Sequence, residues 1–126
     1  MKTIVDTSAI IAYLRKEPPG EIVVELLKEE AVIVPAVCIF ELLAGVKSER
    51  HMQQRRQLLD LSEIAEIDRE ISEKAAELFT VLRSEGITID NEDLLIAATS
   101  IILNLPLLTA NMKHFSYIKN LNMVKG

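Results

Sequence analysis

The segment Thr3-Ile4-Val5-Asp6-Thr7-Ser8 joins a short apolar run to a carboxylate and two hydroxyl groups. Positions 3–6 are predicted to form a short buried strand, and positions 8–16 a helix entered through the Asp-Thr-Ser turn. A carboxylate at such a junction has an ordinary use as a helix N-cap, which needs no metal ion. Because Ser8 could cap the helix instead, Asp6 could also point freely over the end of the strand. Both interpretations are open at this point.

Two more acidic residues lie within strongly apolar runs. Glu41 interrupts Ile39-Phe40-Glu41-Leu42-Leu43, and Asp93 leads Asp93-Leu94-Leu95-Ile96-Ala97-Ala98. Burying an ionised carboxylate costs several kcal/mol unless a cation or hydrogen-bond donors compensate it. Three carboxylates with this cost, Asp6, Glu41 and Asp93, indicate that one group offsets the charge of all three, and a divalent metal ion is the simplest such group. Clustered carboxylates repel one another, so without metal we expect at least one of them to have a raised pKa.

Each of the later acids also has an ordinary explanation. On a helical projection Glu41 lies opposite the predicted core stripe, so by itself it is interpreted as a solvated side chain. Asp90 fits a helix N-cap, where acids are favoured by the macrodipole. Asp93 is the stronger functional candidate of this pair, because the helix that follows it is apolar nearly all round and is predicted to be buried.

The chain of 126 residues is most simply one domain, spanning 1–126, with 49% hydrophobic residues and a mean hydropathy of +0.23. A single cysteine excludes an intramolecular disulfide framework, as expected of a cytoplasmic protein. The most apolar stretch, 94–108, is shorter than a membrane span and carries polar residues, so we expect no membrane segment. The net charge of −5 argues neither for nor against nucleic-acid binding. Acids clustered in a site would lower the net charge without describing the rest of the surface.

Short strands are predicted to alternate with helices along the chain. The expected strands are 3–6, 31–35, 63–67, 107–109 and 122–124, and the expected helices are 8–16, one opening at 18–19, 37–46, 49–61, one capped by Asp68 and closed by Gly86, 90–103 and 111–115. This order predicts an α/β sandwich around a mainly parallel sheet of roughly five strands. Functional groups gather beyond the carboxyl ends of such strands, where Asp6 and the segment 109–111 lie.

The donor types favour a hard cation. Thr109 and Asn111 offer oxygen atoms beside the three carboxylates, although a simple turn explains them equally well. Carboxylate, amide and hydroxyl oxygens suit Mg²⁺ or Mn²⁺ better than zinc. His51 and His114 are isolated in the sequence and are predicted to be surface residues. The chain contains neither a G-x-x-x-x-G-K-[ST] nor a G-x-G-x-x-G motif, which excludes nucleotide binding by those loops.

Four segments in order resemble the PIN domain family, most closely the VapC-type toxin ribonucleases of toxin–antitoxin pairs. They are Ile4-Val5-Asp6-Thr7-Ser8, Phe40-Glu41-Leu42-Leu43-Ala44-Gly45, Asp93-Leu94-Leu95-Ile96-Ala97-Ala98, and Thr109-Ala110-Asn111 followed by Phe115. Each is weak alone, but four at family-like separations over essentially the whole chain are fairly specific. The resemblance implies a three-layer α/β/α sandwich and a metal-dependent endoribonuclease held inactive by a cognate antitoxin, and it also implies a homodimer.

The resemblance further implies that Asp6, Glu41 and Asp93 hold Mg²⁺ or Mn²⁺ and carry catalysis. Supporting groups that orient ligands or water would then be Thr7, Ser8, Thr109, Asn111 and, in part, Asp90. Many PIN domains have a fourth acid where this chain has Asn111, which leaves open whether one or two ions bind. One carboxylate could accept a proton from the attacking water.

The RNA contact is less defined by the sequence. The densest basic group, together with one later lysine, supplies the candidates Lys47, Arg50, Arg55, Arg56 and Lys113. A solvated helix face is the favoured explanation for the first four. With no tryptophan and 4% aromatic residues, a base-stacking platform is not expected. The alternatives are a catalytically inactive PIN-fold interaction module and, less favoured, a phospho-acceptor receiver domain.

Overall fold

The computed structural model describes residues 1–125 and folds into a parallel sheet with helices on both faces. The strands are β1 (Thr3–Val5), β2 (Val32–Pro35), β3 (Glu63–Ala65) and β4 (Leu107–Leu108). The helices are α1 (Thr7–Leu14), α2 (Gly20–Lys28), α3 (Ala36–Leu43), α4 (Glu49–Asp60), α5 (Arg69–Ser84), α6 (Asn91–Leu103) and α7 (Met112–Phe115). All the predicted elements except the strand at 122–124 are therefore present, most of them one or two residues shorter than expected.

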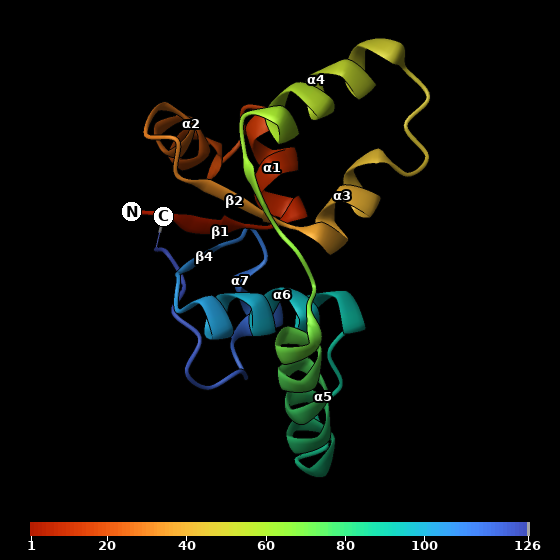
Figure 1. Cartoon of the computed structure of the whole chain (residues 1–126), viewed down its shortest axis with the longest axis vertical. Helices are drawn as coiled ribbons and strands as arrows, with labels where there is room; N and C mark the ends of the chain where they lie inside the picture. Colours follow the sequence, from red (N-terminus) through yellow and green to blue (C-terminus); the bar gives the residue numbers. More distant parts are fainter. Residues whose placement is uncertain (126) are drawn as a thin grey trace.

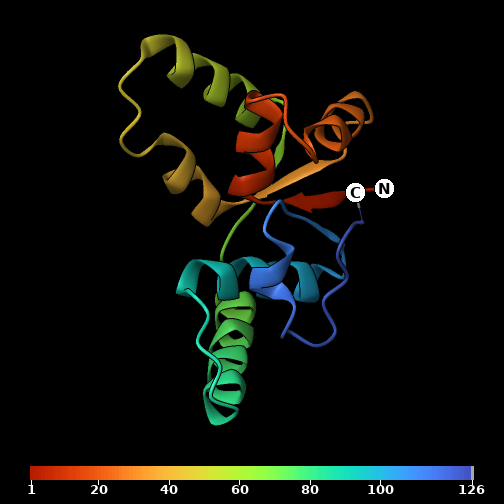
Figure 2. The ribbon, with the colours of Figure 1, turned by 180° about the vertical axis from the view of Figure 1, so that it is seen from behind.

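The strands are parallel and run in the order β3-β2-β1-β4. Ile4 pairs with Ile33 on one side and with Leu107 on the other. In Figures 1 and 2, α1 to α4 lie on one side of the sheet and α5 to α7 on the other, so the three-layer sandwich is confirmed. Because both faces are covered, β1 and β2 are buried along their whole length, which explains their continuous apolar runs.

The expected fifth strand at 122–124 is reduced to a single bridge, between Leu107 and Met123. Leu107 donates to the carbonyl of Asn122 and accepts from the amide of Val124, each at 2.8 Å. β4 is two residues long and follows Pro106, so only Leu107 offers both backbone groups to this edge. The sheet thus has four strands among residues 1–125 rather than roughly five.

Two local signals in the sequence act as predicted. Asp68 caps α5 by accepting the amide of Ile71 at 2.9 Å, and Gly86 beyond the helix end adopts φ +77. Gly20 has a different role, since a Cβ there would lie 2.7 Å from the Cα of Tyr13. The close approach of α2 to α1 therefore requires glycine at this position.

The strand order places a crevice beside Asp6. The chain runs from β1 outward through β2 to β3, and then returns so that β4 pairs with the opposite side of β1. In open parallel sheets, ligands bind beyond the carboxyl ends of the strands where the order reverses. Asp6 follows β1 and Thr109 follows β4, so both residues flank this point. Within the described chain, no helix has the length and apolarity needed to cross a membrane.

Candidate active site

Asp6 is buried at the junction of β1 and α1, with 3% of its surface exposed. It is the N-cap of α1, and its Oδ1 accepts the Ala9 amide at 3.0 Å and the Ser8 hydroxyl at 2.7 Å. The capping interpretation is therefore correct, and Ser8 assists the cap rather than replacing it. The hydrogen bonds from the Ser8 hydroxyl and the Ala9 amide both end on Oδ1.

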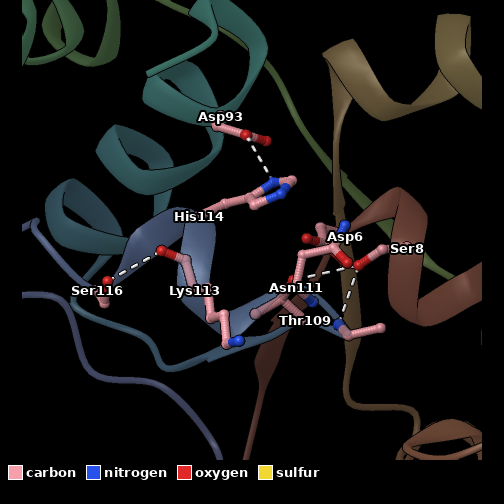
Figure 3. Close-up of polar contacts among 9 residues, drawn as sticks. Asp6, Ser8, Asp93, Thr109, Asn111, Lys113, His114 and Ser116 are labelled. Atoms are coloured by element: carbon pink, nitrogen blue, oxygen red, sulfur yellow. Dashed lines mark hydrogen bonds and ion pairs between the residues drawn. The ribbon is translucent and has the colours of Figure 1, made fainter. Parts of the chain in front are cut away.

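A chain of hydroxyl groups holds Asp6 from the direction of β4 (Figure 3). The Ser8 Oγ donates to Asp6 and lies 3.1 Å from the Thr109 hydroxyl, within hydrogen-bond distance. Ser8 Oγ also accepts the Ala110 amide at 2.9 Å, and Thr109 Oγ1 accepts the Asn111 amide at 3.0 Å. These contacts join the ends of β1 and β4 across more than a hundred residues of sequence.

Glu41 lies on α3 and is held by the start of α1. The Thr7 hydroxyl donates to Glu41 Oε1 at 2.8 Å. Cys38 and Leu42 form the buried side of α3, whereas Phe40 is 74% exposed. Glu41 is half-buried rather than fully solvated, because its side of α3 faces Thr7.

Asp93 is half-buried in the first turn of α6 and is contacted by His114 of α7. The distance from His114 Nδ1 to Asp93 Oδ2 is 3.4 Å, and Figure 3 shows the imidazole pointing from α7 toward this carboxylate. His114 is a surface residue as predicted, with 55% of its side chain exposed, but it is not isolated, because it contacts Asp93 and borders the site. The sequence did carry a signal for this role, because His114 lies in the short helix that directly follows the candidate site residue Asn111.

The carboxylates influence one another's protonation. Burial raises the pKa of the Asp6 carboxyl, and the hydroxyls of Thr109 and Ser8 with nearby backbone amides offset part of that rise. The pKa of Asp93 is also raised, mainly by burial; His114 opposes the rise, while the charges of Asp90, Asp6 and Glu41 add to it. The expected upward direction is confirmed, but burial outweighs repulsion as its cause.

The donor chemistry fits a hard divalent cation, but the side chains do not form a closed coordination sphere. Among residues 1–125, no three His, Cys, Asp or Glu side chains are arranged to hold one metal ion. Glu41 is bonded to Thr7, and Asp93 contacts His114. In this structure the carboxylates of Asp6, Glu41 and Asp93 are therefore not gathered closely enough around one point to coordinate a single ion.

The remaining predicted residues lie in several different environments. Asp90 and Lys113 line a cavity together with Asp93, and Asn111 is exposed at the N-cap of α7 without a side-chain capping bond. Lys47, Arg50 and Arg56 are exposed on α4 and the connection before it, which extends away from the sheet in Figure 1. Arg55 has a different role, because its Nη1 donates to the Leu42 carbonyl at 2.6 Å and so caps the end of α3.

A three-layer parallel sandwich with acids collected at the carboxyl end of its central strands is the arrangement expected of a PIN-type nuclease. The family model described as PIN domain matches residues 3–120. The chain belongs to the PIN domain family.

Within that family, the relatives found are VapC proteins. Ribonuclease VapC1 of Methanocaldococcus jannaschii is 37% identical over 97% of this chain and 85% of its own length. The structure of VapBC2 from Rickettsia felis, bound to a DNA fragment from their promoter, matches with a TM-score of 0.80 and 30% identity over 98% of both chains. DNA-bound VapBC from Salmonella typhimurium matches with a TM-score of 0.86 over 98% of this chain and 97% of its own, and at 21% identity it supports the fold alone. The VapC ribonucleases of this family generally depend on a divalent metal ion.

Proposed function

We propose that this protein is a metal-dependent endoribonuclease that acts as the toxin of a toxin–antitoxin pair. The single observation that carries the proposal is the buried carboxylate of Asp6 at the reversal point of the sheet, with Glu41 and Asp93 brought toward it by α3 and α6. The ribonuclease relative, 37% identical over nearly the whole chain, supports this reaction class. An inactive interaction module gives no reason to keep three mutually repelling acids in one place.

We infer that Mg²⁺ or Mn²⁺ is held by Asp6 Oδ2 together with the carboxylates of Glu41 and Asp93. When bound, such an ion neutralises charge at the phosphate and acidifies water. Asp6 is kept in place by Ser8 and Ala9, so its second oxygen is oriented before a ligand arrives. Thr109 and Asn111 stiffen that arrangement from β4.

Asp93 is the best placed of the three acids to accept a proton from the attacking water. In the metal-free protein its pKa is raised, mainly by burial and further by neighbouring carboxylates, so it binds a proton more readily than a free aspartate does. It is also more accessible than Asp6, with 20% of its side chain exposed. His114 contacts Oδ2, so Oδ1 would face the metal ion and the water bound to it.

The antitoxin partner is proposed from the Rickettsia felis structure, in which a VapB and a VapC protein form one assembly on DNA. A homodimer and a cytoplasmic location are further parts of the proposal. Exposed Lys47, Arg50 and Arg56, with Lys113 near Asp93, would attract the RNA backbone. Light scattering of the purified chain, alone and with its antitoxin, tests both assembly states.

The decisive experiment is induced expression in bacteria of the wild type and of Asp6→Asn, followed by analysis of cellular RNA. Expression of the wild type should arrest growth and cleave cellular RNA. Expression of Asp6→Asn should leave both growth and RNA unchanged. Glu85→Gln, which changes an exposed acid beyond α5, is the matched control and should behave as the wild type. Equal growth and intact RNA for a correctly folded wild type that binds no Mn²⁺ would refute the proposal.

A further inference from the structure

A cavity of about 250 Å³ adjoins Asp93 on the side of α7. One wall is the segment leading into α6, which contributes Ile87, Ile89 and Asp90, and the other carries His114 and Tyr117. The volume is below the roughly 300 Å³ at which pockets for drug-sized ligands begin. It therefore suits one small planar group and not a longer segment of chain.

The walls of this cavity combine an exposed aromatic ring with aliphatic side chains. Tyr117 is 62% exposed, and Ile87 and Ile89 are half-buried. Phe79, another exposed aromatic residue, lines a different cavity beside Ala75 and Leu94 that contains none of the three site acids. Tyr117 thus presents an aromatic surface next to the proposed reaction centre, where aromatic side chains stack on unpaired bases.

The charges around the cavity favour a neutral occupant with hydrogen-bond donors. The carboxylates of Asp90 and Asp93 border it together with Lys113 and His114, so the lining offers both acceptors and donors and suits a polar, uncharged group better than a phosphate. Asp90 occupies the N-cap position of α6 but makes no side-chain capping bond there. Its oxygens are therefore free of the helix and can accept from an exocyclic amino group, as acidic side chains do with cytosine.

We propose that this cavity is a subsite for one unpaired, amino-bearing nucleobase beside the scissile phosphate, stacked on Tyr117 and read by Asp90. The assignment rests on the proposed ribonuclease function and adds a substrate class to it. The base lies next to Asp93, so it belongs to a nucleotide flanking the cleaved bond. A base within a duplex cannot enter such a cavity, so the substrate is single-stranded or has the base flipped out.

The test measures binding of short single-stranded oligoribonucleotides to the full chain in EDTA, where cleavage does not occur. One series carries cytidine or uridine at each position in turn, and a second carries an abasic residue at each position. The wild type should lose affinity at one abasic position and should prefer cytidine to uridine there. Tyr117→Ala should weaken binding about 5- to 100-fold. The affinity of this variant should be the same for the intact oligonucleotide and for the one with the abasic residue.

Matched variants separate stacking from structural effects. Tyr117→Phe should bind as the wild type does, because the ring is kept. Asp90→Ala should remove the preference for cytidine without removing the stacking contribution. Phe79→Ala removes a comparable exposed ring elsewhere and should leave binding unchanged.

The result that overturns the subsite is unchanged affinity of Tyr117→Ala across the abasic series, or no binding of single-stranded RNA by the wild type. Cleavage of the same oligonucleotides with Mn²⁺ separates this from the proposed function. Cleavage without Tyr117-dependent binding refutes the subsite alone. Tyr117-dependent binding without any cleavage supports the subsite and refutes the nuclease.

Discussion

The hydroxyl of Thr7 donates a 2.8 Å hydrogen bond to Oε1 of Glu41, and this bond joins the first turn of α1 to α3. Thr7 directly follows Asp6, so the bond brings the side chain of Glu41 toward the carboxyl end of β1. The helical pattern of α3 had placed Glu41 away from the core, where it would be solvated. Its contact with α1 instead leaves it half-buried beside the residue that follows Asp6.

Replacing Thr7 by valine should weaken metal binding more than it weakens folding. Valine keeps the shape but removes the donor, and a hydrogen bond to a charged group contributes about 1.5–3 kcal/mol. Calorimetric titration with Mn²⁺ should show a lower affinity, with reduced RNA cleavage. Thr80→Val is the control, because the Thr80 hydroxyl bonds only its own helix at Ala76. Equal Mn²⁺ affinity in Thr7→Val and wild type would contradict a role in positioning Glu41.

The metal-free protein should lose stability as the pH rises. Burial raises the pKa of Asp6 in the folded state, whereas in the unfolded chain an aspartate titrates near about 3.9. The folded state therefore holds a proton that the unfolded state has lost. The free energy of unfolding should then fall as the pH rises from about 4 through the raised pKa.

Urea unfolding in EDTA from mildly acidic to neutral pH measures this dependence. Asp6→Asn should show a shallower fall than the wild type, since asparagine keeps the N-cap but carries no charge. Asp60→Asn, at the exposed end of α4, should follow the wild type. Parallel curves for wild type and Asp6→Asn would disprove the linkage.

Removing the Ser8 hydroxyl should cost both stability and activity. Ser8→Ala deletes the contacts to Asp6, Thr109 and Ala110, and a loss of about 1–3 kcal/mol is expected when a partly buried network is broken. Thermal unfolding and cleavage assays report the two effects. Ser116→Ala loses only a local bond to Lys113 and should change neither measurably. A wild-type unfolding temperature in Ser8→Ala would show that the network contributes nothing.

Changing Asn111 to aspartate should strengthen the binding of metal. The Asn111 side chain is exposed and makes no capping bond, so the exchange adds a carboxylate without breaking a contact of the side chain. We expect tighter Mn²⁺ binding in Asn111→Asp and a second ion in the titration stoichiometry. Asn91→Asp, in the exposed first turn of α6, adds the same charge away from this position and is the comparison. Identical stoichiometry and affinity in Asn111→Asp and wild type would exclude position 111 from the metal site.

The local part of the fold was predictable because its signals are short-range. The apolar run before Asp6, the caps at Asp68 and Gly86, and the apolar helix after Asp93 each act through neighbours a few residues away. The prediction of a strand at 122–124 was wrong because a strand forms only where a neighbouring strand offers enough backbone groups to pair with. Only Leu107 in the two-residue β4 could supply both backbone groups to it.

By itself, the sequence determined the alternation of strands and helices, the three acids and the hard-oxygen character of the site. Tertiary structure alone decided that His114 contacts Asp93, that Thr7 holds Glu41, and that Arg55 bonds the Leu42 carbonyl at the end of α3. The physical reason is the length scale of the forces involved. Helix and strand formation depend on neighbouring residues, whereas side chains from α1, α3, α6 and α7 meet only after the sheet has set the positions of its helices.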